Sequence, residues 1–76
     1  MNARDKILKA ADDLFGKVGF DAATTREIAD RSGVNKALIH YHFKSKESLF
    51  ETLLDRYYNR LAAALENELR VPERKI

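Results

Sequence analysis

The sequence lacks cysteine and tryptophan, and it has one proline and three glycines among its 76 residues. Without cysteine there is no disulfide framework, no thiolate metal site and no thiol nucleophile. No apolar run approaches the roughly 20 residues that cross a bilayer, and the first residues lack a basic and then apolar export signal. The length allows one small domain, and these absences predict that it is soluble and cytoplasmic, with no membrane segment.

Few Gly and Pro residues interrupt the chain. The apolar residues recur at three- and four-residue spacing, which is typical of amphipathic helices. We expect an all-α fold with four helices. The first ends at Gly19, the second covers roughly residues 25–31, the third roughly 36–42, and the fourth begins after Ser45 and ends at Pro72. The expected inward face of the first helix consists of Ile7, Leu8, Ala11, Leu14, Phe15 and Val18.

The fourth helix would be about 37 Å long, which is too long for three short helices to cover. We therefore divide the chain into a small domain, residues 1–46, and a connecting helix, residues 47–76. At helical spacing Tyr57 and Tyr58 are more typical of core or interface than of a ligand site. The apolar set of this helix is Leu49, Phe50, Leu53, Leu54, Tyr57, Tyr58, Leu61, Leu65 and Leu69. The four phenylalanines, Phe15, Phe20, Phe43 and Phe50, are all expected in the core.

The second and third helices together have the pattern of a helix-turn-helix. Thr24 and Glu27 are spaced as a capping box at the start of the second helix. Gly33 can adopt the positive φ of a tight turn, and Asn35 can cap the third helix. Ile28 and Ala29 are expected to point inward, while Val34 and Ile39 anchor the third helix against the second. This pattern predicts a homeodomain-like head of three helices.

Positive charge is concentrated in the same segment, because residues 24–46 carry five basic and two acidic side chains. At 100° per residue from buried Ile39, Ala37 and Tyr41 point away from the core and His40 lies on the flank. Lys36 stands at the tip of this helix, and Arg26 lies in the first turn of the preceding one. Such an exposed basic helix fits a DNA major groove. The expected base contacts are therefore Lys36, Ala37, His40 and Tyr41, and Arg26 can reach a base edge or a phosphate.

Helix N-termini offer backbone donors and a positive dipole end to phosphate, and Thr25 and Lys46 lie at two of them. A metal site is not expected, because His40 and His42 are about 200° apart on a helix and cannot converge on one ion. Catalysis is not expected either, since no nucleophile or clustered carboxylates occupy a sheltered pocket. No cofactor is implied.

The run from Thr24 to Phe50, TTREIADRSGVNKALIHYHFKSKESLF, resembles the DNA-binding domain of TetR-family transcriptional repressors, and the preceding LFGKVGF fits the same domain. The resemblance implies phosphate contacts from Thr25, Tyr41, His42 and Lys46. It implies base contacts from Arg26, Lys36, Ala37 and, variably, Tyr41. His40 stands where the family usually has tyrosine, and Asn35 replaces a frequent serine.

The resemblance also implies a larger helical domain after the fourth helix, which binds a small-molecule inducer and dimerises. We therefore expect this chain to be an N-terminal fragment that is monomeric or weakly associating, and a homodimer only in the full-length protein. Its expected function is to bind an operator in double-stranded DNA, most simply as a repressor. An alternative is a protein-interaction module that docks through the apolar face of the fourth helix.

Overall fold

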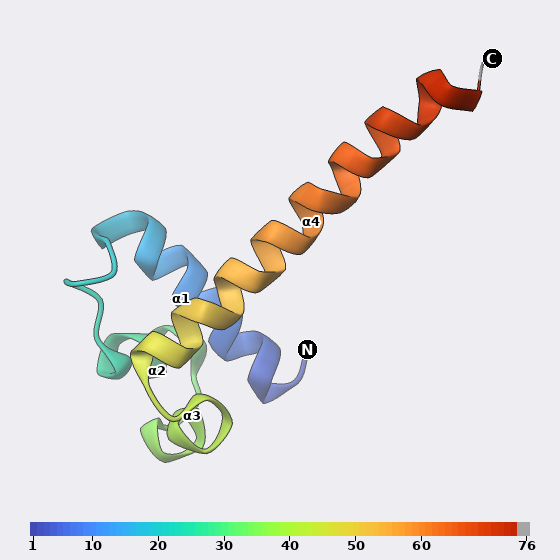
Figure 1. Ribbon diagram of the computed structural model, residues 1–76. Coiled ribbons are helices and arrows are strands. Elements are labelled where there is room, and N and C mark those ends of the chain that lie inside the picture. The colour runs from blue at the N-terminus through green and yellow to red at the C-terminus, as the bar shows by residue number, and fades with distance from the viewer. Residues whose placement is uncertain (75–76) are drawn as a thin grey trace.

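Four α-helices make up the protein in the computed structural model, which describes residues 1–74, with side chains described as far as residue 68. They are α1 (Ala3–Val18), α2 (Thr25–Ser32), α3 (Lys36–Phe43) and α4 (Lys46–Arg74). The first three pack into a small head, and α4 starts against that head and leaves it as a long arm (Figure 1). The molecule therefore measures 55 × 24 × 17 Å along its principal axes. The predicted all-α fold with a long fourth helix is confirmed.

The helix starts are defined by side-chain caps, as the sequence indicates. The Thr24 hydroxyl accepts a hydrogen bond from the N–H of Glu27 at 3.1 Å, and the side-chain oxygen Oδ1 of Asn35 accepts one from the N–H of Leu38 at 2.8 Å. Ser45 caps α4 in the same way. The Glu27 carboxylate reaches back as predicted, but it accepts from the Thr24 hydroxyl at 3.2 Å instead of a backbone N–H. Each cap satisfies a donor that the helix itself leaves unpaired.

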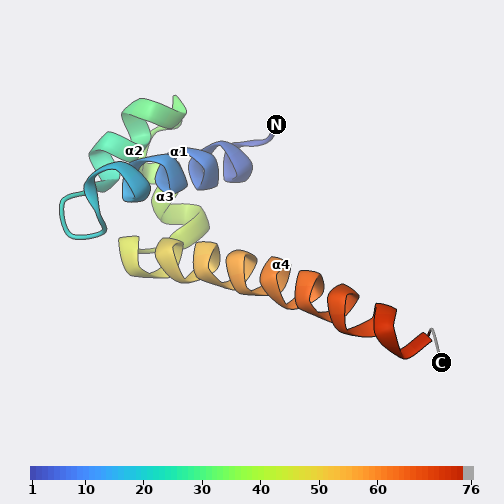
Figure 2. The same ribbon diagram turned by 90° about the horizontal axis from the view of Figure 1, so that it is seen from above.

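A three-residue turn joins α2 to α3, as predicted for a helix-turn-helix. Gly33 ends α2 with φ 73° and ψ 15°, which is the left-handed conformation, and its N–H donates to the Ala29 carbonyl at 2.9 Å. Glycine takes this conformation without a Cβ penalty. The turn lets the chain change direction sharply between α2 and α3. Seen from above, α3 lies between α1 and α4 (Figure 2).

The core is apolar and is supplied by all four helices and the loops between them. Ile28 and Ile39 are buried as predicted, and Leu49 brings the second turn of α4 into the same interior. Val18 was expected on the inward face but is 43% exposed. It is the last residue of α1, directly before Gly19, where the chain leaves the helix. The buried set is Ile7, Leu8, Ala10, Ala11, Leu14, Ala23, Ile28, Val34, Ile39, Phe43 and Leu49.

Three of the four phenylalanines form a partly buried cluster at the edge of the core, so only Phe43 belongs to the fully buried core. The ring of Phe20, in the α1–α2 loop, lies 5.6 Å from that of Phe15 and 4.9 Å from that of Phe50. The Phe15 and Phe50 rings meet edge to face at 5.4 Å. The cluster joins the end of α1, the loop and the start of α4. Ala29, also expected inward, is half-buried against the core.

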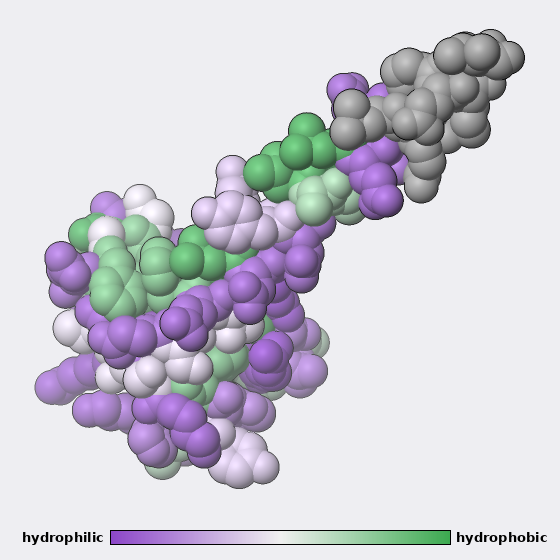
Figure 3. All heavy atoms as spheres, viewed as in Figure 1, coloured by the Kyte–Doolittle hydropathy of each residue, from purple (hydrophilic) through white to green (hydrophobic). Residues whose placement is uncertain are grey.

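The arm, α4, differs from the prediction in where it ends. It continues past Pro72 to Arg74, because a proline this close to the helix end removes only one hydrogen bond of the last turn. Tyr57 and Tyr58 are 58% and 60% exposed, so they are not core residues of this chain, and their place in an interface stays a prediction. Leu53 packs on the head, whereas beyond it the apolar side chains of the arm lie open to solvent (Figure 3). Leu69 lies outside the described side chains.

The turn from α3 to α4 contains a strained residue. Lys44 has φ 71° and ψ −45°, and it is the only non-glycine residue with positive φ among those described. The flanking Ser45 N–H donates to the Phe43 carbonyl at 2.7 Å, which closes a γ-turn around Lys44. That form of the γ-turn is rare because a side chain makes it unfavourable.

Replacing Lys44 by glycine is expected to stabilise the protein. Lys44→Gly should raise the free energy of unfolding by about 1 kcal/mol, since relief of Cβ strain outweighs glycine's added chain entropy. Urea denaturation followed by circular dichroism measures the change. Lys44→Ala is the control, because it removes the side chain but keeps the strain, and it should stay within about 0.5 kcal/mol of the parent. A glycine variant less stable than the alanine variant would contradict the strained turn.

Candidate nucleic-acid interface

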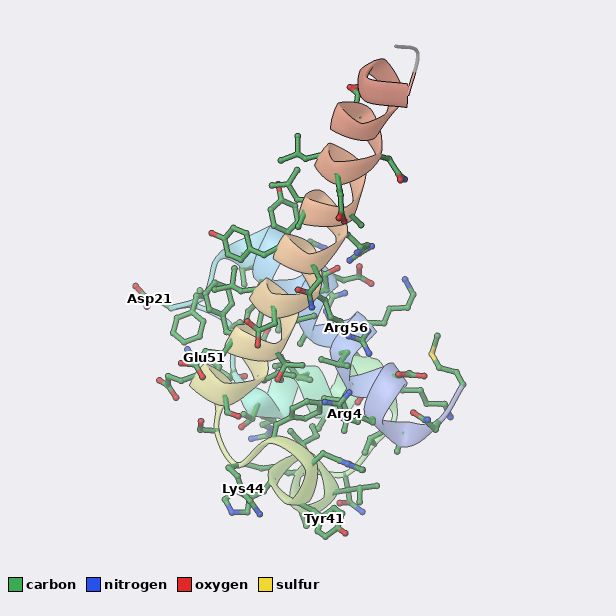
Figure 4. All side chains as sticks on the ribbon, turned by 45° about the vertical axis from the view of Figure 1, so that its right-hand side comes forward. Arg4, Asp21, Tyr41, Lys44, Glu51 and Arg56 are labelled. Atoms are coloured by element: carbon green, nitrogen blue, oxygen red, sulfur yellow. The ribbon has the colours of Figure 1, made fainter. Side chains whose placement is uncertain are left out.

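The outward face of α3 is an exposed strip, which we call the reading strip: Lys36, Ala37, His40 and Tyr41. All four residues are exposed, and Tyr41 is 70% accessible although it is aromatic. Ile39, on the opposite side of the same helix, is 3% exposed. Tyr41 lies at the outer end of the head and points into solvent (Figure 4). The predicted orientation of α3 is therefore confirmed.

Two cations from different helices border one shallow hollow beside this strip. Arg26 of α2 and Lys36 of α3 both line it, together with Asp30 and the turn residues between the helices. Both cations are exposed, so neither is used to hold the head together. The helix-turn-helix thus brings two predicted base-contact residues onto one face, although ten positions separate them in the sequence.

The starts of α2 and α4 present unpaired backbone donors. The caps bind the N–H groups of Glu27 and Ser48. The N–H groups of Thr25 and Lys46, one step into each helix, have no acceptor among the described residues. The starts of α2 and α4 are therefore two positive helix ends with free N–H groups, and such ends bind phosphate oxygens.

The two histidines of α3 occupy different environments. His40 is exposed, whereas the His42 ring is half-buried between the rings of Tyr41 at 5.2 Å and Phe43 at 6.1 Å. His42 is thus held in place beside the reading strip instead of pointing freely into solvent. Within the residues that the structure describes, no group of three His, Cys, Asp or Glu side chains gathers to hold a metal ion.

The Lys46 side chain lies in a place that its sequence position does not suggest. Its ammonium nitrogen donates to the carbonyl oxygens of Phe20 at 2.8 Å and Ala23 at 3.1 Å. The Asp21 carbonyl oxygen lies 3.5 Å away, and the centre of the Phe20 ring lies at 4.2 Å. In this structure the side chain therefore binds the α1–α2 loop, which is more than 20 residues earlier in the sequence.

Arg4, at the start of α1, contacts the end of α3. Its guanidinium carbon lies 5.1 Å from the centre of the Phe43 ring, so the start of α1 packs on the end of α3. The next residue, Asp5, forms an ion pair with Arg56 of α4 at 3.7 Å. In Figure 4 the labelled Arg4 and Arg56 lie on the same side of the molecule. Both pairs join elements distant in sequence, and no local motif predicts such contacts.

Comparison with known families agrees with this geometry. The sequence profile of the family described as "Bacterial regulatory proteins, tetR family" matches residues 7–53, from the core of α1 through the helix-turn-helix to the start of α4. The chain belongs to the TetR family of bacterial regulatory proteins. The resemblance of Thr24 to Phe50 to the DNA-binding domain of TetR regulators is thereby confirmed.

Individual relatives support the same assignment. The HTH-type transcriptional regulator QacR of Staphylococcus aureus is 49% identical over 55 residues, which are 72% of this chain and 29% of QacR. The HTH-type transcriptional activator FasR of Mycolicibacterium smegmatis is 39% identical over 67 residues, or 88% of this chain and 31% of FasR. The HTH-type transcriptional repressor NicS of Pseudomonas putida is 38% identical over 76 residues, or 96% of this chain and 36% of NicS. The chain thus spans about a third of the length of these relatives.

No helix within the described residues combines the length and the hydropathy needed to cross a membrane.

Proposed function

We propose that this chain binds a specific operator in double-stranded DNA and thereby regulates transcription, with the reading strip of α3 in the major groove. The observation that carries the proposal is the exposure of Lys36, Ala37, His40 and Tyr41 on one helix whose other side is buried. Lys36 and Arg26 donate to base edges, and Tyr41 adds ring contact and a hydroxyl. Ala37 is small enough to let the backbone approach the bases. The activity is binding, with no chemical step.

Four residues around the strip are proposed to contact the DNA backbone: Thr25, Tyr41, His42 and Lys46. Thr25 and Lys46 would do so through the free N–H groups at the starts of α2 and α4. Tyr41 and His42 would use side chains at the end of α3, where their rings pack edge to face. Contacts of this kind hold the register of a helix in the groove and supply affinity independent of sequence.

The salt dependence of binding to random-sequence duplex DNA tests the proposal. The basic side chains of residues 24–46 predict that the affinity falls by at least about tenfold between about 50 and 200 mM salt, because each phosphate that a Lys or Arg neutralises releases condensed counterions. Affinity that hardly changes with salt would contradict DNA binding. It would favour the alternative of a protein partner docked on the apolar face of α4.

Lys36→Ala is expected to weaken binding and also to relax base preference. A preferred duplex is first selected from a random pool. Loss of one good base contact should lower the affinity for that duplex by about 5- to 100-fold and lower the affinity for random duplex much less. Lys17→Ala, at the exposed end of α1, is the control with the same change of charge. Equal losses on both duplexes would show that Lys36 contacts only phosphate.

We further propose that the protein acts in the cytoplasm as a homodimer when its family's larger helical domain is attached. Two copies would occupy half-sites roughly 34 Å, or a multiple, apart, as two-fold symmetry requires. A small-molecule inducer would act through that larger domain. Residues 1–76 alone should be chiefly monomeric at low micromolar concentration, and sedimentation that shows a tight dimer would contradict this.

A further inference from the structure

We propose that the Lys46 side chain is a positioning residue for DNA binding, which holds the α1–α2 loop and so fixes the start of α2. This inference rests on the proposed function. Lysine has three N–H donors, and three carbonyl oxygens of the loop lie within 3.5 Å of its nitrogen. The ammonium is therefore bound to the loop, and its donors are used before any DNA arrives.

Two side chains on one face of α4, Lys46 and Phe50, hold the loop. Lys46 and Phe50 are four residues apart and so lie on the same face of the helix. The ammonium lies 4.2 Å from the centre of the Phe20 ring, and the Phe50 ring packs on that ring at 4.9 Å. Phe20 is thus bound by a cation–π contact and a ring contact, while its own carbonyl accepts from Lys46. Asp21, beyond this contact, projects outward from the loop (Figure 4).

The held loop leads directly into the part of α2 that faces DNA in the proposed function. Ala23, whose carbonyl accepts from Lys46, is followed at once by Thr24, the cap of α2. Thr25 and Arg26 are the next two residues. A loop that moves relative to α4 therefore moves a proposed phosphate contact and a proposed base contact together. The Lys46 side chain therefore fixes Thr25 and Arg26 relative to the start of α4, where the free backbone N–H group of Lys46 itself lies.

The position of the ammonium separates this role from a direct phosphate contact. A direct contact needs ammonium donors that are free for phosphate, whereas the Lys46 side chain is half-buried and its nitrogen already donates to carbonyl oxygens of the loop. The salt slope is the steepness with which the logarithm of the affinity falls as the logarithm of the salt concentration rises. Loss of a phosphate contact made by a lysine ammonium lowers this slope by about one unit. Loss of a positioning residue lowers affinity and leaves the slope unchanged.

The test is Lys46→Met, which keeps the aliphatic stem and removes the ammonium. Without DNA, hydrogen exchange of the Ala23 amide, which donates to the Gly19 carbonyl at 3.2 Å, should accelerate at least about tenfold. Exchange of the Ala11 amide in the core should stay unchanged, which shows that the head is folded. If the loop adopts its held arrangement in about one molecule in ten, affinity for every duplex falls about tenfold, with the salt slope of the parent.

Lys44→Met is the matched control, because it removes the same charge two residues away from an exposed side chain. It should leave Ala23 exchange unchanged. Lys46→Gln is the second variant, in case the methionine variant does not fold. Its neutral amide keeps two N–H donors and should retain part of the protection of Ala23.

Three results would overturn the inference. The first is Ala23 exchange in the Lys46 variants equal to that of the parent. The second is faster exchange with unchanged DNA affinity, which would make the contact purely structural. The third is a salt slope smaller by about one unit, which would show that the ammonium itself meets phosphate. If the parent protein binds no DNA, the proposed function fails instead, and Ala23 exchange still reports whether Lys46 holds the loop.

Discussion

Ala37→Glu is expected to lower the affinity for every DNA duplex by at least about 100-fold, because it places a carboxylate at the centre of the reading strip. Ala37 is exposed on α3, so the larger side chain is accommodated in the free protein. In the groove the same side chain keeps the helix backbone away from the bases and repels the phosphates on both sides. Fluorescence anisotropy with a labelled duplex measures the loss.

The matched control is Ala62→Glu, which makes the same substitution at an exposed position of the arm, α4. Both variants carry the same net charge, so a difference between them reports the location of the carboxylate and not the charge of the protein. Ala62→Glu should bind DNA nearly as the parent does. Equal losses in the two variants would mean that the Ala37 face of α3 does not enter the groove.

Ile39→Ala is expected to lower the free energy of unfolding by about 2 to 4 kcal/mol, because it leaves a cavity in the core where the inner face of α3 packs. Ile39 is 3% exposed, whereas Leu61 of the arm is 43% exposed. A protein of this size is typically stable by only about 4 to 11 kcal/mol, so the variant loses a large share of its stability. Urea denaturation followed by circular dichroism measures the change.

Leu61→Ala is the control for this substitution. It removes an apolar side chain that lies largely in solvent, so the free energy of unfolding should change by less than about 0.5 kcal/mol. Equal destabilisation by the two substitutions would contradict the division into a packed head and an exposed arm.

The parts of the fold that depend on neighbouring residues can be predicted from the sequence. A cap needs a side chain and an N–H three residues on, so the caps at Thr24 and Asn35 follow from spacing alone. The exposed face of α3 follows from one buried residue, Ile39, and the helical angle. The left-handed Gly33 follows from the backbone conformation that the turn requires. These local rules also predict which side chains form the reading strip, although the DNA contacts themselves stay a prediction.

The parts that depend on distant residues could not be predicted in the same way. Lys46 lies at a helix start, which suggests phosphate, yet its partners are carbonyl oxygens of a loop more than 20 residues away. The strain at Lys44 arises in the short turn that joins α3 to α4. A glycine there would have indicated a positive φ, but the residue with positive φ is a lysine. Tyr57 and Tyr58 follow a helical apolar pattern, but a pattern does not tell whether a partner covers it. The division of the chain at residue 46 likewise stays a prediction.

Amide chemical shifts during titration with a short random-sequence duplex test the central claim most directly, because they locate the bound surface residue by residue. We predict that the largest shifts occur in residues 36–42 and at the starts of α2 and α4, and that the arm between Tyr57 and Leu65 hardly changes. DNA binding through α3 is contradicted if the shifts concentrate on that arm, or if the duplex leaves α3 unperturbed at concentrations where it binds.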